Sequence, residues 1–131
     1  MVDGSRDTVV GKAKVNSFQD LEVWQTSREL TLDIYKASRS FPKEEVYGLT
    51  SQIRRAAVSI SANIAEGFSR RSNPDKYHFY NMAQSSLQEL KCFLILCEDL
   101  GYLDSKITLW EISERVGKML FRLMETVKNA Y

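Results

Sequence analysis

The chain has 131 residues, of which 44% are hydrophobic and 27% carry a charge. This length suits a single domain that buries one core without disulfides or metals. Lys and Arg number 18 against 17 Asp and Glu, for a formal charge of +1, which excludes a chain that is basic along its whole length. A nucleic-acid site must therefore come from local clustering of basic residues or from several copies of the chain together.

Cysteine usage and hydropathy bear on the compartment. Cys92 and Cys97 would point about 140° apart on a helix, so they cannot pair with each other there. We interpret them as buried thiols in a reducing compartment. The longest strongly apolar run, 93–97, is far shorter than the roughly 20 residues that cross a bilayer. Residues 1–15 lack the apolar centre of a signal peptide, so we expect a soluble cytoplasmic protein with no membrane partner.

The first helix is expected over about 20–40, after a start without sustained periodicity. Residues 1–17 predict a disordered tail, and 18–131 predict the folded domain. Asp20 is the candidate N-cap, and Pro42 is expected to end the helix by disfavouring helical backbone at the residue before it. The residues that recur every three or four positions on one face are Val23, Ser27, Leu30, Ile34, Ala37 and Phe41.

The second helix is expected over about 45–71 and is rich in small residues. Its apolar stripe consists of Leu49, Ile53, Ala56, Ala57, Ile60 and Ile64. Small side chains allow a neighbouring helix to approach closely. Two interpretations stay open: a central helix packed tightly within its own chain, or a helix that also packs against another subunit.

The third helix is expected over about 74–100. Asn73 is its candidate cap, and Pro74 suits the first helical position, where a missing N–H costs nothing. Apolar residues cover so much of its circumference that it requires more than one neighbour. Gly101 supplies the left-handed residue that often ends a helix.

The fourth helix is expected over about 104–129, with Asp104 as its cap. Behind its main apolar stripe runs a second row that contains Trp110, Phe121 and Met124. This row exceeds what the core of one monomer usually needs. Because exposed apolar area of this kind often marks an interface, we predict an oligomer interface at these three residues.

These elements predict an all-α fold. The last three helices are about 26 residues long and the connections are short, which favours an up-down-up-down, antiparallel four-helix bundle.

The sequence offers no catalytic or metal motif. His78 is the sole histidine, and Asp75 alone stands at ligand spacing, whereas a metal site needs three or four ligands. Lys118 and its charged neighbours resemble an ordinary solvated helix face. An enzyme would require His78, Glu66 and Glu89 to converge in one pocket. We predict a protein that is not an enzyme and has no cofactor.

Two polar residues stand in the apolar part of the second helix. A buried Asn63 must be hydrogen-bonded, and we interpret it as a structural polar core residue that fixes helix register. Glu66 belongs to the same predicted polar core and could pair with Arg55 or another basic residue. A ligand-binding role is the alternative.

Basic residues cluster between positions 54 and 76. Arg70, Arg71 and Lys76 stand at one end of the predicted bundle and are candidates for contacts to phosphates. Arg54 and Arg55 are weaker candidates because an internal partner could occupy them. The alternative for the whole cluster is solvation together with internal ion pairs.

Five longer runs of the sequence stand out together. They are FQDLEVW at 18–24, YGLTSQIRRAAVSI at 47–60, NIAEGF at 63–68, SLQEL at 86–90 and LGYL at 100–103. With these runs the chain resembles a known family, the bacterial four-helix-bundle proteins encoded in intervening sequences of 23S ribosomal RNA genes. The resemblance covers about 18–131. Many relatives have proline where this chain has Ser61 and glycine where it has Ser85.

The resemblance implies a function as well as a fold. Relatives form ring-like homopentamers and are similar to the accessory variability determinants of diversity-generating retroelements, which bind a reverse transcriptase and nucleic acid. For this chain it implies a non-catalytic homopentameric scaffold whose partners are further copies of itself, RNA or DNA, and a retroelement reverse transcriptase with its RNA. The alternative is a structural assembly protein with protein partners only.

Overall fold

The computed structural model describes residues 15–128, so most of the predicted tail at 1–17 lies outside the described residues. Within 15–128 every secondary-structure element is a helix and there is no strand, which confirms the all-α prediction. Four α-helices are joined by three connections, and the one between α1 and α2 contains two 3-10 turns. The elements are η1 (Phe18–Asp20), α1 (Glu22–Ala37), η2 (Ser38–Ser40), η3 (Lys43–Glu45), α2 (Leu49–Ser69), α3 (Asn73–Asp99) and α4 (Ile107–Lys128).

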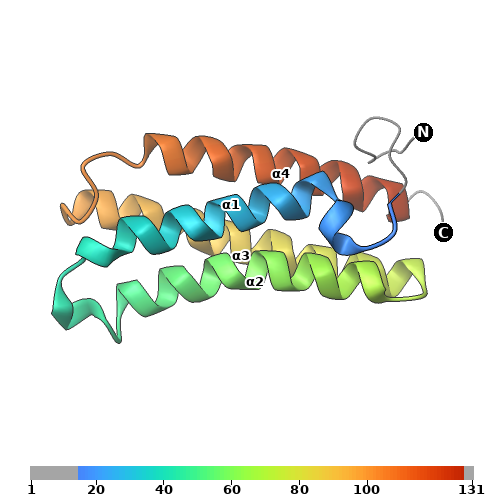
Figure 1. Cartoon of the computed structure of the whole chain (residues 1–131), viewed down its shortest axis with the longest axis horizontal. Helices are drawn as coiled ribbons and strands as arrows, with labels where there is room; N and C mark the ends of the chain where they lie inside the picture. Colours follow the sequence, from blue (N-terminus) through green and yellow to red (C-terminus); the bar gives the residue numbers. More distant parts are fainter. Residues whose placement is uncertain (1–14, 129–131) are drawn as a thin grey trace.

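The four helices lie side by side along one common direction (Figure 1). Helix α1 packs against α2 and α4, and α3 packs against the same two helices. The α1–α2 and α3–α4 connections meet at one end: the rings of Phe41 and Tyr102 lie 5.6 Å apart, and the Tyr102 hydroxyl donates to Glu45 Oε2 at 2.7 Å. Helix α2 therefore leaves this end of the bundle, and α3 returns to it.

The core is formed by the faces that the apolar spacing predicts. Burying each large aliphatic side chain contributes roughly 1.5–3 kcal/mol toward folding, so these stripes supply most of the driving force. The one buried polar residue in the predicted stripe of α1, Ser27, is satisfied because its Oγ donates to the Trp24 carbonyl at 2.8 Å. Fully buried members of the stripes include Leu30, Ile34, Ile53, Ile60, Ile64, Leu90, Leu94, Val116 and Leu120.

The N-terminal ends of α1 and α2 differ from the prediction. Helix α1 begins at Glu22, and Asp20 does not cap it: the Asp20 carboxylate instead accepts from the backbone N–H groups of Asn16 and Ser17 at 2.9 and 3.1 Å, within the turn of η1. Helix α2 begins at Leu49 because Lys43–Glu45 forms a separate 3-10 turn. That turn places Glu45 Oε1 3.0 Å from the Leu49 N–H, so a side chain from outside the helix satisfies its first turn.

The predicted starts of α3 and α4 also differ from the structure. Ser72 caps α3, since its Oγ accepts from the Asp75 N–H at 3.2 Å. Helix α4 begins at Ile107 rather than at Asp104, and the Ser105 Oγ accepts from the Ile107 N–H at 3.1 Å. The prediction for Gly101 is confirmed by its φ of +80°, which is a left-handed conformation.

The two cysteines have different environments. Cys97 is buried as predicted, and burial, reinforced by the charge of Glu45, raises the pKa of its thiol to about 11. Cys92 is exposed, so the prediction of two buried thiols is wrong for this residue. An angular separation of about 140° on one helix explains the difference, because a single core face cannot include both.

Candidate nucleic-acid interface

The predicted phosphate-binding end of the bundle is the α2–α3 connection, and two of its cations are engaged within the chain. The guanidinium of Arg70 forms an ion pair with Glu66 and lies 4.5 Å from the centre of the Phe79 ring. Lys76 Nζ donates to the Phe68 carbonyl at 2.8 Å and lies 5.4 Å from the Phe68 ring. Glu66 therefore pairs with a basic residue other than Arg55, as the prediction allowed.

Lys76 stabilises the C-terminal end of α2. Carbonyl groups at a helix C-terminus carry partial negative charge and favour a nearby cation. Partial burial lowers the pKa of Lys76, so this ammonium is less well hydrated than a surface lysine. Arg71 is exposed, and none of the ion pairs within residues 15–128 involves it. Of the three predicted phosphate ligands, Arg71 is the most accessible.

The other two predicted cations lie toward the opposite end of α2. Arg54 Nε donates to Ser38 Oγ at 2.8 Å, and its guanidinium lies 4.6 Å from the centre of the Tyr35 ring, so Arg54 joins α2 to the end of α1. Arg55 is exposed and makes no ion pair within the described part of the chain. Fourteen residues at 1.5 Å each separate Arg55 from Ser69, the last residue of α2, by roughly 21 Å, and Arg71 lies beyond that end. The five predicted basic residues therefore do not form one patch.

The predicted polar core is only partly internal. Asn63 is partly buried, and its Nδ2 donates to the carbonyl and Oγ of Ser59 at 2.9 and 3.0 Å. Ser59 Oγ in turn lies 2.8 Å from Ser86 Oγ on α3, which gives a short polar chain between the two helices. Glu66 is exposed, so the prediction that it belongs to the polar core is wrong.

The three residues predicted at an oligomer interface have three different environments. Met124 is only 6% exposed and packs in the core of its own chain, so it is not available to a partner. Trp110 is partly buried beneath Lys91 and Lys106, whose ammonium groups lie 5.1 and 5.8 Å from its ring centre. Phe121 is 58% exposed and alone of the three presents its ring to solvent.

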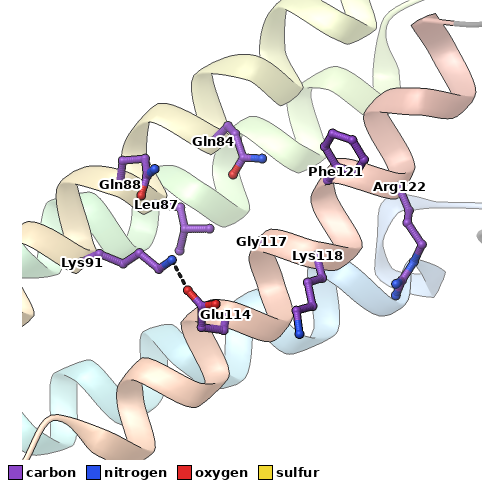
Figure 2. Close-up of a pocket in the computed structure, with 9 residues that line it drawn as sticks. All are labelled: Gln84, Leu87, Gln88, Lys91, Glu114, Gly117, Lys118, Phe121 and Arg122. Atoms are coloured by element: carbon purple, nitrogen blue, oxygen red, sulfur yellow. Dashed lines mark hydrogen bonds and ion pairs between the residues drawn. The ribbon is translucent and has the colours of Figure 1, made fainter.

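Phe121 lies in a groove of about 490 Å³ between α3 and α4. Figure 2 shows Gln84, Gln88 and Lys91 on α3, and Phe121 on α4. The groove is open here because Gly117 has no side chain; a Cβ at this position would lie 3.3 Å from Leu87 Cδ2. The nine lining residues are Gln84, Leu87, Gln88, Lys91, Glu114, Gly117, Lys118, Phe121 and Arg122.

The charges on the groove are predominantly positive. Glu114 is the one carboxylate among the lining residues, and it forms an ion pair with Lys91. That hydrogen bond and charge, with a smaller contribution from Lys118, lower the pKa of Glu114. Lys118 and Arg122 are exposed, and none of the ion pairs between residues 15 and 128 involves either one. An anion that approaches α4 therefore meets two available cations one helical turn apart.

Sequence reasoning missed this groove. Lys118 and Arg122 are four residues apart, which places them on one face of a helix, and Phe121 is adjacent to that face. This combination of basic and aromatic residues was a usable signal. Helical spacing alone does not reveal this combination, because it places Phe121 in an apolar row and Lys118 on an ordinary solvated surface.

The described residues show no cluster of side chains suited to binding a metal ion. Residues 15–128 contain no group of three or more His, Cys, Asp or Glu side chains that could hold a metal ion. His78 is exposed and makes an edge contact with Phe79, with ring centres 5.1 Å apart. Eleven residues of helix separate His78 from Glu89, roughly 16 Å, so the pair does not converge with Glu66 in one pocket. No helix within 15–128 is long and apolar enough to span a bilayer.

The fold and its grooves define the chain as an α-helical bundle protein. Residues 19–122 match the family of 23S rRNA-intervening sequence proteins, and the chain belongs to this family. Its fold is similar to that of a protein of unknown function from the S23 ribosomal protein family of Bacteroides thetaiotaomicron VPI-5482. That similarity has a TM-score of 0.70 at 24% identity and covers 78% of this chain and 97% of the other. A comparison with curated proteins finds no match.

Proposed function

We propose that the protein is a non-catalytic, homo-oligomeric scaffold that binds nucleic acid. The observation that carries this proposal is the α3–α4 groove, where Lys118 and Arg122 are available beside the exposed ring of Phe121. Contacts to phosphates dominate the affinity of nucleic-acid-binding proteins, and aromatic rings add sequence-tolerant contacts to bases. Arg71 and Arg55 add positive charge elsewhere on the surface.

The proposal extends to a cytoplasmic, ring-like homopentamer of antiparallel bundles that serves as an accessory protein for a retroelement reverse transcriptase and its RNA. The resemblance described above supports this extension. Repetition of the groove in each copy answers the objection from a formal charge of +1, because phosphate contacts made by several copies add along one strand.

We place the subunit contact on the outer row of α3. Met82, Leu96 and Leu100 are 42%, 42% and 55% exposed. At 100° per residue these three positions lie within about 40° of one another on the helix, roughly 80° or more from Gln88 and roughly 140° or more from Lys91. The row therefore lies on a different side of α3 from the groove, and both surfaces can be used at once.

The nucleic-acid proposal is tested by measuring the affinity for a labelled RNA or DNA strand at several salt concentrations. For the wild type we expect log K to fall linearly with log salt concentration. The double variant Lys118→Gln/Arg122→Gln removes two phosphate contacts from each groove, so each groove engaged should reduce the slope by about 1.4 for a single strand. Arg115→Gln is the matched control, because Arg115 lies on α4 but 3.7 Å from Glu29 of α1. Binding that is absent or independent of salt rules out the proposal.

A second candidate function is a structural assembly protein with protein partners only. It is favoured by apolar side chains at the end of the bundle where the connections meet: Tyr47 is 95% exposed, and Val46 and Ile107 are 50% and 64% exposed. This candidate predicts a stable oligomer without affinity for nucleic acid. Measuring the mass in solution of the wild type and of Leu96→Glu tests the assembly that both candidates require; an unchanged mass would show that the α3 row is not the subunit contact.

A further inference from the structure

We infer that the α3–α4 groove holds an unpaired base of a single-stranded nucleic acid, stacked on Phe121, while neighbouring phosphates contact Lys118 and Arg122. This inference rests on the proposed function and adds the class of nucleic acid and the way in which it is held.

Phe121 is placed to stack on a planar ligand rather than to pack against a subunit. Its ring is exposed, and the groove residues around it include the cations Lys118 and Arg122 and the amides Gln84 and Gln88. The centres of protein–protein interfaces are depleted of charged residues, so these surroundings do not suit an oligomer contact. A lone aromatic ring beside cations is instead the combination that holds single strands.

The groove has room for the base. Gly117 lies one helical turn before Phe121, and the missing Cβ leaves the wall beside Leu87 open. The volume of about 490 Å³ falls within the range of pockets that hold small organic ligands. Leu87 is buried and forms an apolar floor, so a base that enters the groove contacts Leu87 as well as the ring of Phe121.

The opposite wall carries groups that can satisfy the edge of a base. Gln84 and Gln88 are one turn apart on α3 (Figure 2). Each amide offers both donors and an acceptor, so each can adapt to a different base by turning over. In a duplex these base edges are paired and the base faces are stacked, which leaves only phosphates to contact. The groove therefore favours a single strand over a duplex.

The two cations define a path for the backbone outside the groove. In Figure 2 the side chains of Lys118 and Arg122 extend from α4 on the side away from Gln84 and Gln88. Residues four apart on a helix are separated by about 6 Å, a spacing that allows contacts to neighbouring phosphates. A strand that follows these two cations along α4 can turn a base across the helix onto Phe121.

The test compares three labelled probes of equal length by fluorescence anisotropy: an oligouridylate, an abasic strand with the same phosphates, and a duplex. We expect the wild type to bind the oligouridylate at least about fivefold more tightly than the abasic strand, the lower end of what one aromatic–base stack contributes. Phe121→Leu should abolish this preference without weakening binding of the abasic strand, and Phe121→Tyr should retain it. Tyr47→Leu is the matched control, since Tyr47 is an exposed aromatic residue outside the groove.

Two results overturn the inference while leaving the proposed function intact. The first is salt-dependent binding without a preference for bases in the wild type, or with a preference that survives in Phe121→Leu. The second is a change in the mass of the oligomer in Phe121→Leu, which would assign the ring to a subunit contact. Failure of all three probes to bind at any salt concentration removes the proposed function as well.

Discussion

Helix α3 contacts its two neighbours in different ways, and a glycine lies at each contact. Toward α2 the contact is closed: a Cβ on Gly67 would lie 2.6 and 2.8 Å from two carbons of the Tyr80 ring, which is 1% exposed. Toward α4 the contact is open: a Cβ on Gly117 would meet only Leu87 Cδ2, at 3.3 Å, beside the groove. One glycine therefore makes room for a core side chain, and the other leaves space at the surface.

This difference separates stability from binding within one small bundle. The aromatic ring that occupies the space at Gly67 is part of the core, so that contact is fixed by packing. At Gly117 the core ends at Leu87, and the space beyond it is lined by charged and amide side chains that contribute little to folding. Changes at the two glycines should therefore have opposite consequences.

Gly67→Ala should have the largest effect. Alanine is favoured over glycine in a helix by about 1 kcal/mol, but inserting a methyl group into a filled core typically costs about 1–3 kcal/mol, and a buried ring cannot move aside. We expect a net loss of up to about 2 kcal/mol, measured as a lower urea midpoint at constant slope.

The matched control is the same change in a Tyr80→Leu background, where the two ring carbons are absent and only the contact with Phe79 Cβ, at 3.1 Å, remains. There Gly67→Ala should cost much less, and a double-mutant cycle measures the coupling between the two positions. A loss of equal size in both backgrounds would show that contact with Tyr80 is not the reason for glycine at this position.

Gly117→Ala should have a smaller effect of opposite sign. The Leu87 methyl group can shift by a few tenths of an ångström toward the groove, and the gain in helix propensity then dominates. We expect a gain in stability of up to about 1 kcal/mol, together with weaker binding of a base-bearing strand because the groove is narrower. A variant that loses stability would show that this contact is as tightly packed as the one at Gly67.

The contrast also shows how far the sequence leads. Spacing alone identified the buried faces, such as Ile53, Ile60 and Ile64 on α2, because a period of 3.6 residues is a local property of the chain. The helix starts were less predictable. Asp104 and Ser105 are both good caps, and only the path of the connection decides that Ser105 bonds the first turn of α4.

The candidate site could not be predicted to the same extent, since it depends on contacts between helices. Spacing places Phe121 beside Met124 in a second apolar row, yet Phe121 is exposed and Met124 is buried. The ion pairs between helices are equally hard to predict from the sequence. Lys91 and Glu114 are 23 residues apart in the chain, and nothing local distinguishes Glu114 from the other carboxylates of α4.

The ion pair between Lys91 and Glu114 should have the smallest effect on stability. Its contribution can be measured from how stability changes with pH. Lys91 lowers the pKa of Glu114 in the folded chain, so the pair stabilises the fold fully at neutral pH and loses its contribution as pH falls through the folded-state pKa. The stability difference between wild type and Lys91→Met should therefore shrink on acidification below the usual carboxylate range. The contact between Lys91 and the Trp110 ring does not involve Glu114, so it persists at low pH. In a Glu114→Gln background the same difference should not vary with pH; if it does, another carboxylate carries the titration.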